Sequence, residues 1–408
     1  MRRSLASSVI PAALLVSLPW VAPVLAAQDA GSRRAPVPLA PQASAEAPLQ
    51  FEDVAARAAR AREADASDEA IRWYRRGVAM RPKWDEGWWY LATLLYDRDR
   101  YAAARDAFSR FLALKPDPGP ARALRGLCEF QIGHYEASLR DLARWMSEGS
   151  AGNDETRQVA WYHLSILRIR GGQFELALEP MTQLCRSGLE SPRVVRAAGL
   201  MLLRMPTLPE DVPTEKQEMV DAAGRASYSW LALRNEETHA RFRELLDRFP
   251  RAPNAHYGYG LFLMGQDPEA ALAEFREEMK VQPGSVYPRL ETAFELIKRG
   301  DFAAARPYAE DGVKLAPGLF AARNALGRVL VELGELEHGI AELEEAARLA
   351  PDSPEMFFAL ARAYQKAGRK DEAEKARATF QRLEEIRRAR KTPGLAGEGG
   401  PRGAASPR

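Results

Sequence analysis

The chain has few of the residues that build most catalytic and metal-binding sites. Its 408 residues include only two cysteines and five histidines. The histidines lie far apart, and no HExxH pair or Cys/His spacing typical of zinc sites occurs. A GxSxG elbow, a phosphate-binding glycine loop and a dinucleotide fingerprint are also missing. We therefore expect no enzyme activity, no catalytic residues, no metal and no cofactor.

The chain also lacks an excess of charge of one sign. Lys and Arg total 58 and Asp and Glu total 56, which gives a formal net charge of +2. Proteins that bind nucleic acid through its phosphates usually carry a basic surplus or a basic stripe. Because neither is visible here, we do not expect a nucleic-acid partner.

Long apolar runs are absent beyond the first residues. Arg2 and Arg3 precede an apolar run over 9–25 that three prolines interrupt and that ends in small residues. This order is typical of a secretory signal peptide, and the run is short for a transmembrane helix. We predict a signal peptide over 1–26, the alternative being a retained anchor helix. Cleavage leaves an exported protein, periplasmic or secreted, with no integral membrane segment.

Helical periodicity is what the chain does contain, from Phe51 onward. Residues 27–50 are rich in Pro and Ala and are predicted to form a flexible linker. After them, apolar residues recur at steps of three and four, and no stretch alternates as a strand does. Residues 392–408 have the composition of a disordered tail. The sequence thus predicts one helical region over 51–391.

Prolines and small residues show that this region is repetitive. Pro82 and Pro116 lie 34 positions apart, as do Pro283, Pro317 and Pro351 in turn. Between these prolines a small residue recurs at one phase, and a second one follows twelve positions later. The first set is Ala92, Gly126, Ala293, Gly327 and Ala361, and the second is Ala104, Ser138, Ala305, Gly339 and Ala373. A period of this length indicates stacked helix pairs.

This pattern resembles the tetratricopeptide repeat, in which Trp, Leu, Gly or Ala and Tyr mark a first helix. Ala, Phe, Ala and then Pro follow on the second helix. Matching residues in one stretch are Trp88, Leu91, Ala92, Ala104, Phe108 and Pro116. Matches in two later stretches are Leu326, Gly327, Leu330, Gly339, Leu343, Ala346 and Pro351, and then Leu360, Ala361, Tyr364, Ala373 and Phe380. The expected turns fit as well, because a helix-ending glycine stands before an aromatic residue at Gly133, Gly172 and Gly300.

The resemblance implies an all-α fold. It predicts a right-handed α-solenoid of antiparallel helix pairs, with about eight repeats and a charged C-terminal capping helix. The proline-rich segment 205–218 departs from the pattern, and we interpret it as an insertion beside one extra helix. A second departure is a repeat shortened by one residue near Gln266.

Cys128 and Cys185 fall in successive repeats, on a first and a second helix. An exported protein permits one disulfide without requiring it. We favour two free, buried thiols, because a free cysteine usually behaves as a small core residue.

The resemblance also implies a binding surface, because the family's concave wall is formed by fixed positions of each first helix. The aromatic and apolar residues at these positions are Trp89, Tyr96, Phe130, Tyr162, Ile166, Tyr257, Phe294 and Phe358. Asn324 holds another inner position, and toward the C-terminus the wall becomes basic, with Arg328 and Arg362. We expect these two arginines to orient acidic residues of a ligand. The family's Lys and Asn clamp for a peptide carboxylate is disfavoured, since Tyr, Leu and Phe hold its positions.

These observations predict a protein–protein interaction scaffold that binds a segment of a protein or peptide partner in its concave groove. The alternative open at this point is a structural or assembly component of a cell-envelope complex that uses its convex face or its ends. An enzyme with a site of scattered acids is disfavoured, because no motif supports it. The sequence identifies neither the partner nor the oligomeric state.

Overall fold

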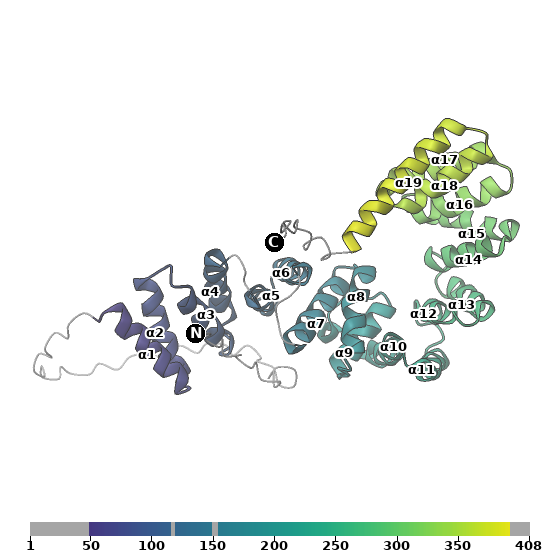
Figure 1. Ribbon diagram of the computed structural model, residues 1–408. Helices are drawn as coiled ribbons and strands as arrows, with labels where there is room; N and C mark the ends of the chain where they lie inside the picture. Colours follow the sequence, from purple (N-terminus) through teal and green to yellow (C-terminus); the bar gives the residue numbers. More distant parts are fainter. Residues whose placement is uncertain (1–48, 116–118, 149–153, 392–408) are drawn as a thin grey trace, which may run out of the picture. The chain divides into compact units, whose positions relative to one another are not determined.

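The computed structural model describes residues 49–115, 119–148 and 154–391, and within these ranges the chain is entirely helical (Figure 1). The first helix begins at Phe51 and the last ends at Lys391. The predicted signal peptide, nearly all of the predicted linker and the predicted C-terminal tail lie outside the described residues. No described helix is both long and apolar enough to cross a membrane.

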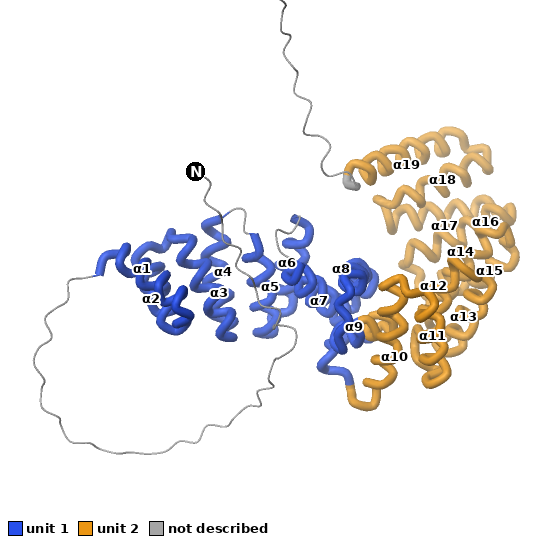
Figure 2. The backbone as a smooth tube through the Cα atoms, turned by 60° about the horizontal axis from the view of Figure 1, so that its bottom comes forward, with its two compact units in different colours: residues 1–197, 205–212 blue, residues 198–204, 213–408 orange. Residues whose placement is uncertain are grey.

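Two compact units make up the chain (Figure 2). Unit 1 comprises Met1–Ala197 and Met205–Val212, and unit 2 comprises Ala198–Arg204 and Pro213–Arg408. The helices of unit 1 are α1 (Phe51–Glu63), α2 (Ser67–Met80), α3 (Asp85–Tyr96), α4 (Tyr101–Leu114), α5 (Ala121–Gln131), α6 (Tyr135–Ser147), α7 (Asp154–Arg170) and α8 (Phe174–Arg186). Helix α9 (Pro192–Leu202) contributes residues to both units.

Unit 2 holds the remaining helices. They are α10 (Thr214–Leu231), α11 (Asn235–Arg248), α12 (Ala255–Leu263), α13 (Pro268–Val281), α14 (Tyr287–Arg299), α15 (Phe302–Leu315), α16 (Phe320–Glu332), α17 (Leu336–Leu349), α18 (Pro354–Lys366) and α19 (Lys370–Lys391). Each helix from α1 to α7 packs against the next helix in the chain, and so does each helix from α10 to α18. The prediction of an all-α array of helix pairs is confirmed, with nine pairs among the described helices instead of about eight.

Small residues set how closely two helices of a pair approach. A Cβ placed on Gly327 of α16 would lie 2.8 Å from the carbonyl oxygen of Gly339 on α17. The reverse holds too, since a Cβ on Gly339 would lie 2.9 Å from the carbonyl oxygen of Gly327. Ala92 and Ala104, at the same two phases of an earlier repeat, are completely buried. The two recurring small positions are therefore the points where paired backbones meet.

The helix ends follow from local chemistry. Gly300 closes α14 with φ +79°, in the left-handed region that lets its backbone N–H bond back to the last turn. Gly133 and Gly172 adopt the same region, as the sequence predicts for turns before an aromatic residue. On the starting side, Asp301 caps α15 by accepting a hydrogen bond from the backbone N–H of Ala304 at 3.1 Å.

The two departures from the repeat pattern are both ordered. In the proline-rich segment, Pro209–Asp211 form a 3₁₀ turn, and Leu208 and Val212 are buried. Helix α10 already begins at Thr214, so the insertion is shorter than 205–218. The extra helix is α9, and Gly199 on it packs so closely on α10 that a Cβ would overlap the carbonyl oxygen of Val220.

The shortened repeat contains α12, which has only 9 residues where α14 has 13. Its start is held by Glu278 of α13, a completely buried carboxylate. This carboxylate accepts hydrogen bonds from the backbone N–H groups of Asn254 at 2.9 Å and Tyr257 at 3.1 Å. A buried acid thus satisfies N–H groups that a helix N-terminus otherwise leaves unpaired.

Both cysteines are buried and form no disulfide bond, as the sequence predicts. Cys128 lies on α5 and Cys185 on α8. Burial raises the pKa of the Cys128 thiol to about 12. A thiol that stays protonated at neutral pH is unreactive, so we interpret Cys128 as a residue of the packed core.

Candidate functional site

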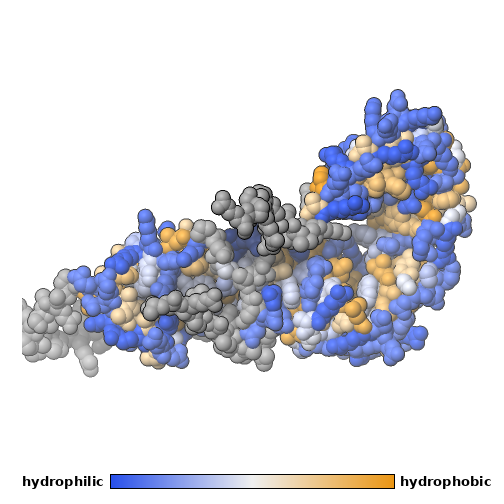
Figure 3. Space-filling view, viewed as in Figure 1, coloured by the Kyte–Doolittle hydropathy of each residue, from blue (hydrophilic) through white to orange (hydrophobic). Residues whose placement is uncertain are grey.

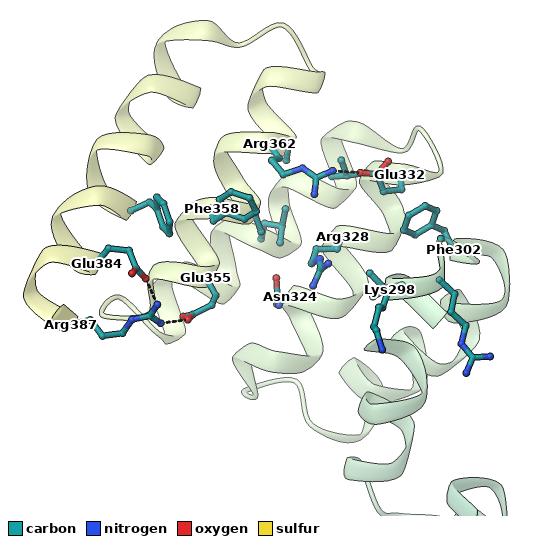
Figure 4. A pocket seen from close by; sticks show the side chains of 18 residues that line it. Lys298, Phe302, Asn324, Arg328, Glu332, Glu355, Phe358, Arg362, Glu384 and Arg387 are labelled. Atoms are coloured by element: carbon teal, nitrogen blue, oxygen red, sulfur yellow. Dashed lines mark hydrogen bonds and ion pairs between the residues drawn. The ribbon is translucent and has the colours of Figure 1, made fainter. Parts of the chain in front are cut away.

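The C-terminal helices of unit 2 enclose a pocket with a volume of about 830 Å³ (Figure 4). The first helices of three successive pairs, α14, α16 and α18, contact one another in sequence and supply most of its wall. The second helices α15, α17 and α19 each contribute further side chains. Figure 3 shows apolar side chains over the α14–α18 part of unit 2 among hydrophilic neighbours.

One side of the pocket is aromatic. Phe358 of α18 is 50% exposed, which is unusual for a phenylalanine. Its ring packs at a tilt on Phe380 of α19, with 5.5 Å between ring centroids. Phe302, the first residue of α15, also lines the pocket. An exposed aromatic pair inside a cavity offers apolar area that a ligand can cover.

Ion pairs hold most of the charged side chains at the rim (Figure 4). The Arg362 guanidinium lies 3.5 Å from the carboxylate of Glu332. Arg387 of α19 pairs with Glu355 at 2.6 Å and with Glu384 at 2.5 Å. These pairs link α16 to α18 and α18 to α19, so they fix the walls relative to one another.

Two further cations on α14 are also paired. Lys298 lies 3.1 Å and Arg299 2.9 Å from the carboxylate of Glu295. Burial raises the pKa of Glu295, but the hydrogen bonds and charges of these two cations outweigh burial and lower the pKa overall. At neutral pH the three residues therefore form a charged cluster on α14, and Arg299 also pairs with Glu269 of α13.

Arg328 and Asn324, one turn apart on α16, differ from their neighbours. Arg328 is partly buried and makes no ion pair or hydrogen bond with any described residue. Burial, and then the like charge of Arg362, lower the pKa of its guanidinium. The Oδ1 atom of Asn324 is buried without a donor from the described residues, which costs about 1–3 kcal/mol when nothing compensates.

The pocket brings together three of the ten sequence-predicted site residues: Arg328, Phe358 and Arg362. Two others in unit 2 lie outside it. Tyr257 packs against the rings of Phe275 and Tyr287 at 5.9 and 6.1 Å. Phe294 is partly buried against the apolar core between α14 and α16.

The five predicted site residues of unit 1 mostly pack within that unit. Three are partly buried, with ring contacts of Trp89 on Phe111, Tyr96 on Tyr101, and Phe130 on His163. Tyr162 and Ile166 are only 7% and 1% exposed, so these two do not form part of an open binding surface. Burial raises the pKa of Tyr162, and Glu210 of the proline-rich segment and Arg193 of α9 also act on it, so this segment and the extra helix lie beside Tyr162.

Several lining residues were not among the predicted site residues. Phe302, Phe380 and Arg387 belong to second helices, which the family's inner positions do not include. Asn324 stood at an inner position, but its buried, unpaired oxygen depends on the packing around α16. The aromatic that follows a helix-ending glycine at Gly300 was a local signal for Phe302.

A second pocket of unit 2, about 590 Å³, lies among α11, α12 and α13 and contains His239 and His256. Nδ1 of His256 lies 2.6 Å from the carboxylate of Glu274, and its Nε2 lies 3.3 Å from the carbonyl oxygen of Pro250. Among the residues with described positions, no group of three or more His, Cys, Asp or Glu is arranged to hold a metal ion.

Tetratricopeptide-repeat family models match residues 90–148, 232–284 and 296–356. The chain therefore contains tetratricopeptide repeats. The last matched range spans α15, α16 and α17, which contribute Phe302, Asn324 and Arg328 to the pocket. Domains of this family typically act as scaffolds for protein interactions, and in this general sense the chain is an interaction scaffold.

Solved structures of other repeat proteins are similar to parts of the chain. A MamA fragment from Desulfovibrio magneticus RS-1 is 24% identical, covers 42% of this chain and 97% of its own, and has a TM-score of 0.36. YrrB, described as a TPR protein with an unusual peptide-binding site, is 18% identical over 44% of this chain and 95% of its own, with a TM-score of 0.36. The Cut9–Hcn1 complex matches 82% of this chain and 87% of its own at 13% identity and a TM-score of 0.34. A search of curated proteins found no match.

Proposed function

We propose that this repeat protein binds an extended segment of a partner protein in its groove and that the α14–α19 pocket is the docking point. The observation that supports this proposal most directly is Phe358, half exposed beside Phe380 inside a cavity of about 830 Å³. A side chain of this size is normally covered in a folded protein, and here a ligand supplies the cover.

The expected affinity is modest. A phenylalanine has about 200 Å² of surface, so covering the exposed half removes about 100 Å² of apolar area from water. At about 25 cal/mol per Å² this stabilises the complex by about 2.5 kcal/mol, before the cost of ordering the segment. Ligand atoms that enter the rest of the pocket add to this term.

A displayed library of short random peptides, selected against the full chain, tests the proposal. Enriched peptides are synthesised, and their affinities are measured for the wild type and for Phe358→Ala. We expect Phe358→Ala to weaken binding about tenfold or more, as for a central aromatic of an interface. The matched control is Leu315→Ala, because Leu315 is an exposed apolar residue of unit 2 that does not line the pocket.

Two results decide the outcome of this test. Loss of affinity in Phe358→Ala but not in Leu315→Ala, with both variants as helical as the wild type, supports the pocket as docking point. Equal affinity of all three proteins for every selected peptide contradicts it.

A second candidate function, as an assembly component, has one specific observation in its favour. Leu176 and Leu178 of α8 in unit 1 are largely exposed. Exposed leucines on a second helix suit a contact through the outer face of the array. Sedimentation of the wild type and of a Leu176→Ser/Leu178→Ser variant distinguishes the two functions, since only an assembly surface makes the sedimentation coefficient depend on these side chains.

We further propose that the protein works outside the cytoplasm after removal of residues 1–26. The basic start, the short apolar run and the small residues at its end support this proposal. Expression in a bacterium, cell fractionation and N-terminal sequencing test it. A mature chain that begins near Ala27 is expected, whereas an intact N-terminus in the membrane fraction supports the anchor instead.

A further inference from the structure

We infer that the segment bound in the α14–α19 pocket carries a carboxylate side chain that pairs with Arg328, next to an apolar side chain that covers Phe358. This inference rests on the proposed function and specifies the chemistry of its ligand. It also separates Arg328 from Arg362, which the sequence alone treats alike.

The first step is a comparison of the cations that line the pocket. Lys298 and Arg299 pair with Glu295, Arg362 with Glu332, and Arg387 with Glu355 and Glu384. Among the described residues, Arg328 is the one lining cation that has neither an ion pair nor a hydrogen bond. Its positive charge is therefore the one that the folded chain leaves for a ligand.

The second step is the cost of leaving Arg328 unpaired. Its guanidinium is partly buried, and burial and the charge of Arg362 both lower its pKa. A desolvated cation without an anion is unfavourable, and a carboxylate that accepts two parallel N–H bonds compensates for the lost water. The geometry of the site thus favours an anionic ligand group at this residue.

The third step concerns Asn324, one turn before Arg328 on the same helix. The residue is only 7% exposed, lines the pocket, and its Oδ1 has no donor from the described residues. Figure 4 shows its side chain between Phe358 and Arg328. A backbone N–H of the bound segment can supply the missing donor, which fits an extended peptide whose own backbone groups are unpaired.

The fourth step selects a carboxylate over a phosphate. One free guanidinium balances a single negative charge, and the nearby carboxylate of Glu332 already acts on it. Glu355 and Glu384 also line the pocket. A phosphate carries about −1.5 to −2 charges at neutral pH, which the single unpaired guanidinium balances only in part, because the other lining cations already pair with carboxylates. The neutral wall of Phe358 and Phe380 beside Arg328 then accommodates an apolar neighbour of the acid.

A double-mutant cycle between ligand and protein tests the inference. A selected peptide is compared with the same peptide in which Asp or Glu is changed to Asn or Gln, against the wild type and Arg328→Gln. We expect the amide change to weaken binding to the wild type about tenfold and to have little effect with Arg328→Gln. Arg348→Gln is the matched control and should keep the full dependence on the acid, because Arg348 does not line the pocket and pairs with Glu345.

Other outcomes overturn the inference in distinguishable ways. If the amide change weakens binding equally in wild type and Arg328→Gln, the acid does not pair with Arg328. If a phosphoserine at the acid's position binds more tightly than Asp or Glu, the carboxylate assignment is wrong. Loss of binding in Phe358→Ala with no effect of Arg328→Gln removes this inference alone, whereas no effect of either substitution removes the proposed function as well.

Discussion

At the scale of single residues, the surroundings rather than the residue type decide what a side chain does. Arg328 and Arg362 occupy equivalent positions on α16 and α18, yet only Arg362 has a carboxylate within ion-pair distance. Glu278 and Glu277 are adjacent on α13, but the first is completely buried and caps another helix, while the second is exposed and pairs with Lys280.

The Glu278 carboxylate gives a first prediction. Glu278→Gln removes the charge and one acceptor that serve the N–H groups of Asn254 and Tyr257. We expect the free energy of unfolding to fall by about 2 kcal/mol, because hydrogen bonds to a buried charge are strong and the N–H groups are left without water. Urea denaturation followed by circular dichroism measures the change. Glu277→Gln is the control, and a similar loss in both variants would contradict the capping role.

His163 on α7 gives a pH prediction. Its Nδ1 donates to the carbonyl oxygen of Val159 at 2.8 Å, and burial lowers its pKa from 6.5 to about 4. Above pH 6.5 the residue is neutral in both states; below it, the unfolded chain takes up the proton first. The free energy of unfolding should therefore fall between about pH 6.5 and pH 4.

Replacing the histidine checks the cause of this slope. His163→Leu should flatten the decrease in stability over that window, measured as the urea midpoint at each pH. His338→Gln is the control substitution, because the side chain of His338 is 82% exposed. His256 acts in the opposite direction: burial lowers its pKa, but the hydrogen bond and charge of Glu274 outweigh burial and raise it. Its contribution is present below pH 6.5 and lost as the pH rises through the folded pKa.

At the scale of elements, each helix depends on which of its backbone hydrogen bonds are missing and on how closely it packs against its partner helix. Pro180 lies inside α8 and has no N–H for the carbonyl oxygen of Leu176, four residues earlier. A guanidinium N–H of Arg168 on α7 donates to that oxygen instead. The paired helix thus repairs the break, and α8 continues to Arg186.

The contact between α16 and α17 gives the element-scale prediction. Alanine favours a helix over glycine by about 1 kcal/mol, yet Gly327→Ala should destabilise the protein by about 1–3 kcal/mol. The added Cβ would lie 2.7 Å from a side-chain carbon of Leu343 and 2.8 Å from the carbonyl oxygen of Gly339. Thermal unfolding measures the change. Gly318→Ala, where a Cβ meets nothing within 4 Å, should change stability little, and an equally stable Gly327→Ala would show that the helices can separate without cost.

At the scale of the whole molecule, the chain divides into two compact units, each built from neighbouring helix pairs. In such arrays each repeat is stabilised by its neighbours, so damage stays local. Gly327→Ala should therefore speed amide hydrogen exchange in α16, α17 and adjacent helices of unit 2. Helices α1 to α8 of unit 1 should keep their protection. Hydrogen exchange with mass spectrometry checks this, and equal loss of protection in both units would show that the chain unfolds as one block.

The sequence by itself determined the helical repeat and its main departures. A period of 34 residues, small residues at two phases and glycines before aromatic residues are local rules, and each acts within one repeat. The extra helix near residue 200 and the shortened repeat near Gln266 were visible as breaks in these rules.

Only the tertiary structure decided which inner residues are accessible. Tyr162 and Phe358 hold the same repeat position, but Tyr162 is only 7% exposed, while Phe358 is 50% exposed and opens onto a pocket beside Phe380. The exposure of a side chain depends on how closely neighbouring repeats approach. Whether an arginine is paired depends on which carboxylate lies within ion-pair distance of its guanidinium. Both are set by contacts between residues distant in the chain, so no pattern within one repeat encodes them.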